Sequence, residues 1–376
     1  MNYLRTAKKL NRKVLTSSIL TALLICMDTH AEKIALSWEK AHLELVNQHI
    51  VPSYQRLLKS SIQLQNDIAS YCKPLRMTES DKKEDKGNLD QQAVSISNNF
   101  KQLYLNWASV QPINFGPITY LKRQTRMQYW PDKHNVGSKQ LRRLLADESS
   151  KKLSLDELQK KSVALQGLPA LEKIIFSKKP ITSANCTLAH RISENIESIA
   201  RETYDGWIQP PALFMNDFLP KNYDYGTYSS TEEITSVIVK GITHYLAIIE
   251  QEKLKSVVEK NLHKNNLRKL EAWRSGISAQ LIHANLKMVE NMYLSVFSAQ
   301  LIRKNITLDK NIKRLFSSLK SATQSTASLY ERLQMPEEHQ KVLRWKRDIK
   351  ELQILVHQAF NQELGIAFAF NSLDGD

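Results

Sequence analysis

Apolar residues recur every three or four positions along most of the chain, which is the spacing of an amphipathic helix. Long helices are predicted over 38–71, 94–110 and 186–207, with shorter ones over 156–165 and 169–176. Four further amphipathic patterns with short links follow residue 231, and they favour a helical bundle. Glycine is scarce, with 10 residues in 376, which disfavours a protein built from tight β-turns. The chain is therefore expected to be all-α.

Two segments interrupt this helical periodicity. Residues 209–230 are rich in Pro, Tyr and Gly, and we expect them to link an N-terminal domain over 32–208 to a C-terminal domain over 231–376. Residues 112–137 combine prolines and glycines with aromatic side chains and lack a helical period. A long irregular loop of this kind inside a compact domain is usually functional or packed over a neighbouring element.

The first 31 residues have the three parts of a cleaved secretory signal: a basic start, an apolar run over 14–25, and small residues at Thr29 and Ala31. The apolar run is too short to span a membrane comfortably, and no later segment of the sequence approaches a membrane span. A lipoprotein attached through Cys26 is less favoured, because the preceding residue is isoleucine rather than a small one. The mature chain is expected in the periplasm, without a transmembrane span.

The formal net charge is +15 and falls to +11 without the first 31 residues, which hold five basic residues and one acidic residue. Such a balance attracts anionic partners. The basic residues are scattered along helical patterns beside Glu and Asp, however, and no RNA- or DNA-binding signature accompanies them. We therefore expect a solvated basic surface and no nucleic-acid partner.

Cysteine usage agrees with export. Two of the three cysteines, Cys72 and Cys186, remain after signal cleavage, in a compartment that favours disulfides. We predict that these two residues form a disulfide bond. The chain-entropy estimate for closing a loop of this size is about 4–5 kcal/mol, as an upper figure.

Several familiar catalytic motifs are missing from the sequence: there is no His-Glu-x-x-His helix, Cys-x-x-Cys pair, Gly-x-Ser-x-Gly turn or phosphate-binding glycine loop. His190 and Glu194 could in principle share a metal, but a surface pair is favoured on their spacing alone. The stretch GLPALE over 167–172 begins an apolar helix. With Pro169 at the first helical position, Glu172 is expected in the first turn, where the helix N-terminus stabilises a carboxylate by about 0.3–1 kcal/mol.

Four motifs, taken in order, match one protein family. They are LNWASVQPINFGPITY with the following YWPD, then GLPALE, then EAWRSGIS, and finally FNSLDGD. The chain resembles the imelysin-like proteins, also catalogued as the imelysin peptidase family, which are exported helical proteins of bacterial envelopes. The resemblance covers essentially the whole mature chain. It implies two helical-bundle domains packed side by side, a site at their interface and a role in iron acquisition, together with a disputed label as a metallopeptidase.

The sequence departs from this family at the position that would hold a metal. The family motif is Gly-x-His-x-x-Glu; Gly167 and Glu172 occupy its ends, but Pro169 stands where the histidine belongs. Proline has no side-chain donor, and zinc hydrolysis normally needs three protein ligands and an open position. Asn114 also replaces an arginine that often precedes the Phe-Gly pair of the family. The chain is therefore expected to be a variant lacking the histidine, with Glu172 as the remaining candidate metal ligand.

Residues from all four motifs are candidates for a ligand site at the domain interface. The set is Gly167, Glu172, Phe115, Gly116, Trp130, Asp132, Glu271, Arg274, Ser275 and Asp374. In this interpretation Glu172 faces the interface near Trp130, Asp132 and Arg274, and an arginine–carboxylate pair there fixes domain geometry or recognises a charged ligand. In the alternative interpretation Glu172 only stabilises the start of its helix.

Three functions stay open from the sequence. The favoured one is a periplasmic, non-catalytic binding or accessory protein for iron or haem uptake that acts through a ligand or an envelope protein partner, and iron enters only through the resemblance. The second is a metal-dependent peptidase, in which Glu172 and further ligands such as His134 or His190 hold iron or another divalent metal. The third is an envelope scaffold that binds anionic lipid or polysaccharide. No cofactor is predicted from the residues themselves.

Overall fold

A computed structural model describes residues 38–75, 86–132, 134–178, 181–210, 213–224 and 226–366. Every regular element in these ranges is a helix, so the all-α prediction is confirmed for this part of the chain. None of the helices in the same ranges is both long and apolar enough to cross a membrane. The predicted signal peptide, the lipoprotein alternative at Cys26 and the candidate residue Asp374 lie outside the described residues.

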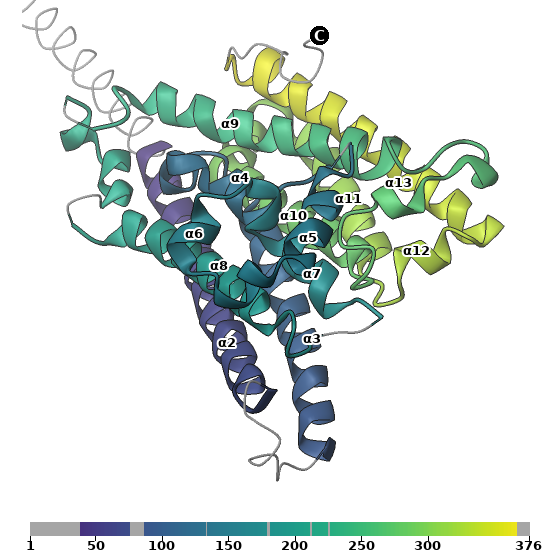
Figure 1. Ribbon diagram of the computed structural model, residues 1–376. Coiled ribbons are helices and arrows are strands. Elements are labelled where there is room, and N and C mark those ends of the chain that lie inside the picture. Colours follow the sequence, from purple (N-terminus) through teal and green to yellow (C-terminus); the bar gives the residue numbers. More distant parts are fainter. Residues whose placement is uncertain are drawn as a thin grey trace, which may run out of the picture.

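Three long helices from the N-terminal half of the chain pack together (Figure 1). They are α2 (Val51–Leu75), α3 (Lys86–Val110) and α8 (Cys186–Ile208). Each buries an apolar stripe of the predicted spacing; on α8, Ile192, Ile196 and Ile199 are fully buried. Pro52 has no amide N–H to donate, and the turn before it widens into the π-helix η1 (Val46–Ile50).

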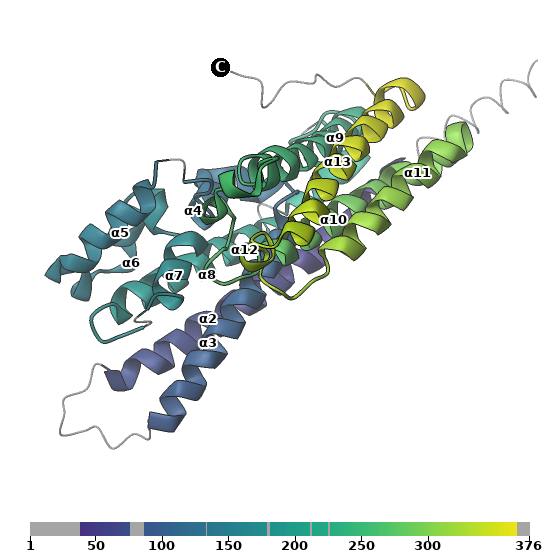
Figure 2. The same ribbon diagram turned by 90° about the vertical axis from the view of Figure 1, so that its right-hand side faces the viewer.

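Four helices from the C-terminal half form a second group, which Figure 2 shows beside the first. They are α9 (Thr231–Ile248), α10 (Ser278–Tyr293), α11 (Ala299–Thr323) and α13 (Pro336–His357). Both α10 and α13 pack on α9 and on α11, which is the arrangement of a four-helix bundle. The single-turn helix α12 (Leu329–Arg332) lies in the connection before α13.

The two groups of helices share one core. Helix α3 of the first group packs against α10 of the second, and the buried apolar side chains of both groups form a continuous cluster. The connection between the groups contributes to this cluster, because Phe214 and Phe218 pack on both Trp207 and Tyr228. The division into two domains with a linker at 209–230 therefore stays a prediction.

Short helices between α3 and α8 pack on these two long helices and on one another. They are η3 (Gly116–Lys122), α4 (Arg123–Met127), α5 (Val136–Ala146), η4 (Glu148–Lys152), α6 (Leu155–Gln159), η5 (Val163–Leu165) and α7 (Leu168–Ile175). The segment predicted to be an irregular loop thus contains a 3-10 turn, a short helix and the start of α5, and residues 112–115, 128–132 and 134–135 are its irregular parts. The predicted helix over 169–176 corresponds to α7.

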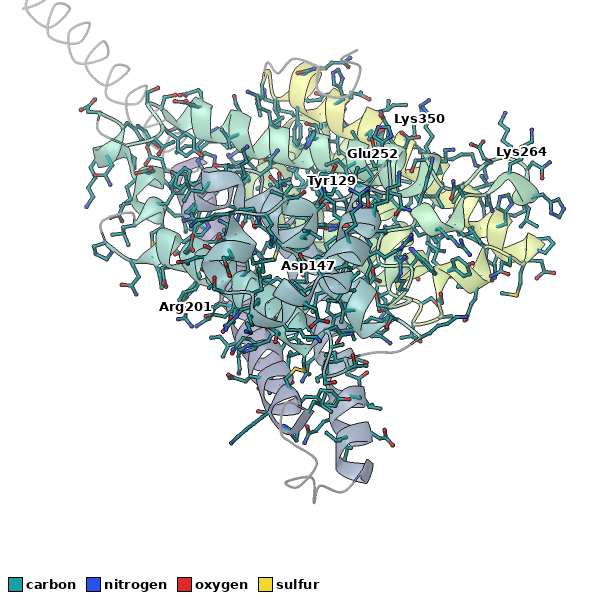
Figure 3. The ribbon with its side chains drawn as sticks, viewed as in Figure 1. Tyr129, Asp147, Arg201, Glu252, Lys264 and Lys350 are labelled. Atoms are coloured by element: carbon teal, nitrogen blue, oxygen red, sulfur yellow. A yellow bond between two sulfur atoms is a disulfide. The ribbon has the colours of Figure 1, made fainter. Side chains whose placement is uncertain are left out.

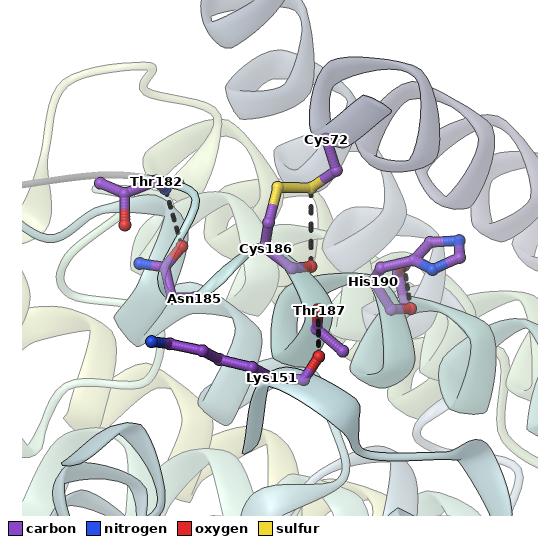
Figure 4. The surroundings of a disulfide bond; sticks show 8 residues. Cys72, Lys151, Thr182, Asn185, Cys186, Thr187 and His190 are labelled. Carbon is purple, nitrogen blue, oxygen red and sulfur yellow. Dashed lines mark hydrogen bonds between the residues drawn. A yellow bond between two sulfur atoms is a disulfide. The ribbon is translucent and has the colours of Figure 1, made fainter. Parts of the chain in front are cut away.

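The predicted disulfide between Cys72 and Cys186 is confirmed. It joins the last turns of α2 to the first residue of α8, and the two Cα atoms are 5.6 Å apart (Figure 4). The side chain of Asn185 accepts a hydrogen bond from the amide of Thr182 and thereby orders the turn that leads into α8. The disulfide thereby holds the C-terminal end of α2 against the start of α8.

Candidate functional site

A cleft of about 1350 Å³ separates the short helices of the N-terminal half from the segment that connects α9 to α10. Residues 129–132 and residues 169–173 of α7 form one side, which we call the α7 wall. The π-helix η8 (Ile249–Lys255) and residues 256–274 form the other side, the connector wall. Figure 3 labels Tyr129 on the α7 wall, and Glu252 and Lys264 on the connector wall. The cleft therefore brings together segments that lie far apart in the sequence.

Glu172 lies on the α7 wall and is nearly inaccessible, with 4% of its surface exposed. Its Oε1 atom accepts two hydrogen bonds from Ser275, one from the backbone N–H at 2.9 Å and one from the hydroxyl at 2.8 Å. Burial raises the pKa of the Glu172 carboxyl, while the hydrogen bonds from Ser275 and the charge of Arg274 act in the opposite direction. The carboxylate thus ties α7 to the segment before α10.

The expectation that Glu172 stands in the first turn of its helix is wrong. Helix α7 begins at Leu168, with Gly167 as the N-cap and Pro169 one position later, and its first turn contains no acidic residue. Glu172 falls in the second turn because the helix includes the residue before the proline. Its stabilisation comes from Ser275 and not from the free amides at the helix start.

Arg274 lines the same cleft but does not form the expected pair with Glu172. Among the ion pairs of the described residues, Arg274 has none within 4.0 Å. Its guanidinium lies instead over the ring of Trp273, 4.3 Å from the ring centroid. Burial lowers the pKa of Arg274, and the charge of Glu172 opposes this effect. Ser275 therefore takes the direct contact that was expected of the arginine.

Trp130 and Asp132 also line the cleft, as the sequence interpretation places them. The carboxylate of Asp132 accepts hydrogen bonds from the amides of Val136 at 2.7 Å and Gly137 at 3.0 Å, at the start of α5. It also forms an ion pair with Lys173 of α7, with an N···O distance of 3.7 Å. Asp132 therefore connects α5 to α7 and positions the α7 wall.

Gly167 contributes through backbone packing. A Cβ atom at this position would lie 2.1 Å from the carbonyl oxygen of Met127 and 2.4 Å from that of Arg126. Its φ of −126° is open to any residue, so the close approach of the α4 backbone is what requires glycine here.

Phe115 and Gly116 were expected at the same site, but the structure places them elsewhere. They line a second cavity of about 290 Å³ together with Phe214 and Tyr228. Gly116 has a φ of +74°, and a Cβ atom there would lie 2.9 Å from the Trp207 ring. The turn at Gly116 directs the chain away from the cleft.

Glu271 lies beneath the cleft instead of on its surface. It forms a buried ion pair with Lys253, with an N···O distance of 2.5 Å, and accepts a hydrogen bond from Gln111 at 3.2 Å. Lys253 also donates to the side chain of Asn285 at 2.7 Å. Burial lowers the pKa of Lys253, and the charge of Glu271 opposes this. The pair belongs to a polar network that links α3, η8 and α10.

The sequence interpretation missed most of the connector wall. The cleft-lining basic residues of this wall that it did not name are Lys255, Lys260, Lys264, Arg268 and Lys269. Tyr104 of α3 also reaches the cleft, and it accepts a hydrogen bond from Gln128 at 3.2 Å. The available signal was the density of lysine and arginine between η8 and α10, in a stretch without a helical period.

The described residues contain no group of three or more His, Cys, Asp or Glu side chains arranged to hold a metal ion. His134 is exposed and is not among the residues that line the cleft. His190 lies on α8, where its ring contacts Gln65 at 3.1 Å and Glu194 at 3.7 Å. Neither histidine accompanies Glu172.

These observations define an all-α protein with a charged cleft between two packed groups of helices. The sequence model named Peptidase_M75 and described as Imelysin matches residues 50–356. The chain belongs to the imelysin family. No curated protein matches its sequence significantly.

Solved structures share the fold. An imelysin-like protein from Psychrobacter arcticum 273-4 superposes with a TM-score of 0.70 at 17% identity, over 89% of this chain and 98% of the other. A "putative iron-regulated protein A precursor" from Parabacteroides distasonis ATCC 8503 superposes with a TM-score of 0.66 at 15% identity, over 87% of this chain and 95% of the other. Both are similar to this chain throughout nearly their whole length.

Proposed function

We propose that this chain is an exported, non-catalytic binding protein of the imelysin family that serves iron uptake through a ligand or an envelope partner held at the cleft. Export is supported by the three-part pattern of residues 1–31 and by the disulfide, because disulfides persist in oxidising compartments. The proposal includes two helical-bundle domains that meet around 209–230, with the cleft between them.

The environment of Glu172 is the observation that favours a binding role over a catalytic one. The carboxylate is buried, and both hydrogen bonds to its Oε1 come from Ser275, a neutral residue of the opposite segment. A metal site would need further ligands beside it, but Pro169 offers no donor atom and no candidate ligand cluster exists among the described residues. The structure thus supports Glu172 as a connector between the walls of a ligand cleft.

The link to iron is supported by the comparison alone. One similar solved structure is that of a "putative iron-regulated protein A precursor", and the family resemblance implies a role in iron acquisition. A binding protein for iron uptake needs no catalytic residues, which agrees with the loss of the motif histidine at Pro169.

Iron uptake by cells under iron limitation tests this function. A strain lacking the gene should accumulate less radioactive iron than its parent, and the full chain should restore uptake. The matched control is the same chain without residues 1–31, which should fail to restore uptake because it stays in the cytoplasm. Equal iron uptake in the parent and the deletion strain would overturn the proposal.

A metal-dependent peptidase is the second candidate, and the peptidase name of the matching family model favours it. If the binding proposal holds, the purified protein should bind no stoichiometric zinc or iron and should hydrolyse none of the peptides in a library. Pro169→His adds the missing ligand and should raise the affinity for zinc. Hydrolysis by the unmodified protein that disappears in Glu172→Ala would establish the peptidase and contradict the binding proposal.

A further inference from the structure

The cleft carries far more positive than negative charge. Its lining contains four acidic side chains and nine basic ones, namely Arg142, Lys173, Lys255, Lys260, Lys264, Arg268, Lys269, Arg274 and Lys346. Within the described ranges, Lys173 is the one member of this set with an ion pair, to Asp132. Asp132 and Glu172 already accept hydrogen bonds from the protein. The cleft therefore holds an excess of cations that the protein itself does not neutralise.

The backbone that carries these cations is held in place. The amide of Asn266 donates to the carbonyl of Val257 at 3.0 Å, and the side chain of Asn265 accepts from the amide of Glu259 at 2.9 Å. His339 of α13 is buried, and its Nε2 donates to the carbonyl oxygen of Glu259 at 2.9 Å. Because α13 and these local bonds fix the segment, its lysines and arginine project from a preorganised surface.

Aromatic surfaces accompany the cations. Trp130 and Tyr129 line the α7 wall, and Trp273 lines the base of the connector wall. Trp273 stacks on Tyr330, with ring centroids 5.5 Å apart. The guanidinium of Arg274 also lies over the Trp273 ring, 4.3 Å from its centroid. A stacked guanidinium is held in orientation while its N–H groups stay able to hydrogen-bond in the guanidinium plane.

We propose that the cleft binds a small polyanion, a ligand with several carboxylate or phosphate groups spaced along a few bonds. This inference rests on the proposed binding function and names the chemical class of its ligand. A concave surface with an excess of one sign of charge focuses its field and concentrates a ligand of opposite charge, and charge-assisted hydrogen bonds then hold the ligand oxygens. Hard cations prefer oxygen ligands, so a polyanion can carry an iron ion without a ligand cluster from the protein.

Titration calorimetry with two probes tests the class of ligand. Citrate represents the carboxylates, pyrophosphate represents the phosphates, and acetate is the singly charged control. The protein should bind citrate or pyrophosphate at least about tenfold more tightly than acetate, and more weakly as salt rises. Binding of one probe alone assigns the ligand to carboxylates or to phosphates. Failure of both probes to bind more tightly than acetate would overturn the proposal.

A matched pair of triple variants locates the binding site. Lys255→Gln, Lys264→Gln and Arg268→Gln together remove three exposed cations of the connector wall. Lys310→Gln, Lys350→Gln and Arg303→Gln remove the same charges from exposed positions that do not line the cleft. The first triple variant should weaken binding of the probe at least about tenfold, and the second less than about twofold. Equal losses in the two variants would contradict a site in the cleft.

The two proposals fail in different ways. If neither probe binds but the deletion strain still loses iron uptake, the polyanion inference is wrong and the function stands. If a probe binds at the connector wall but iron uptake is unchanged by the deletion, the ligand class is right and the iron function is wrong.

Discussion

Lys253 and Lys255 are two positions apart at the end of η8, but their surroundings are opposite. The Lys253 side chain is 3% exposed and pairs with the equally buried Glu271, with help from Asn285. Lys255 is exposed in the cleft, and no ion pair to it occurs among the described residues. The same residue type thus serves two purposes within one turn of helix.

This difference follows from the cost of transferring a charge out of water. A buried ammonium group must be paired and hydrogen-bonded to be tolerated, so Lys253 is held by Glu271 and Asn285 and is unable to serve a ligand. Lys255 retains its solvation and needs no partner. The polar network beneath the cleft therefore holds the helices together, while the cations above it stay accessible to a ligand.

Lys253→Met is expected to have the largest effect, because it leaves the Glu271 carboxylate buried without its counter-ion. The free energy of unfolding should fall by about 3–5 kcal/mol, as measured by urea denaturation at pH 7. The matched control, Lys255→Met, should change it by less than about 0.5 kcal/mol. A loss below about 1 kcal/mol for Lys253→Met would remove the contrast between the two lysines.

Gly167→Ala tests how rigidly the α7 wall is held. The new methyl group would meet the carbonyl oxygens of Arg126 and Met127, and we expect a loss of about 1–3 kcal/mol in the free energy of unfolding. Gly137→Ala is the matched control and should cost less, since a Cβ atom there would lie 3.1 Å from Lys173 Nζ, 3.2 Å from the Asp132 carboxylate and 3.3 Å from the Ala164 carbonyl oxygen. Similar unfolding midpoints for the two variants would show that the wall yields easily.

Glu172→Gln should have the smallest effect, visible as a change in pH dependence. Burial raises the pKa of Glu172 above its ordinary value of 4.5, so the folded state binds the proton more tightly than the unfolded state does. Its proton-linked stabilisation is complete below about pH 4.5 and is lost as the pH rises through the pKa of the folded state. Glutamine does not titrate.

The measurement is the free energy of unfolding of both proteins from pH 4.5 to 8. The value for Glu172→Gln minus that for the unmodified protein should increase with pH. Ser275→Ala removes a hydrogen bond to the carboxylate and should steepen the pH dependence of the unmodified glutamate. A difference that decreases as the pH rises would contradict the assigned direction of the pKa shift.

The helices and the disulfide could be predicted because local features determine them. The apolar stripe of α8 repeats at helical spacing, and Pro112 follows the end of α3 at Val110. Cys72 and Cys186 are the two cysteines left after the predicted signal cleavage, so one pairing was available. Such features require no knowledge of what packs against them.

The candidate site was predicted only in part, because the path of the backbone between the motifs decides which of their side chains meet. Phe115 is close to Trp130 in sequence, but positive φ values at Gly116, Leu121 and Lys122 turn the chain between them. Glu271 and Arg274 belong to one motif, yet the first points into the interior and the second lines the cleft. Spacing within a motif does not specify which side chain is buried.

Most of the connector wall was not predicted, because its sequence reads as a solvated loop. Residues 256–274 have no amphipathic period, and their two single turns, η9 (Leu262–Lys264) and η10 (Leu267–Lys269), are too short to predict. The cations gather because His339 and Lys346, from a helix much later in the chain, hold the carbonyl groups of Glu259 and Val258.

The Cys72–Cys186 bond has a topological consequence for the two walls. It closes residues 72–186 into a covalent ring, and this ring contains Trp130, Asp132 and Glu172 of the α7 wall. The connector wall lies outside the ring and is attached through noncovalent contacts and the ordinary chain. In an oxidising compartment the α7 wall therefore belongs to a cross-linked ring, and reduction of the disulfide in a reducing compartment would open that ring. The covalent structure of the connector wall is the same in both compartments.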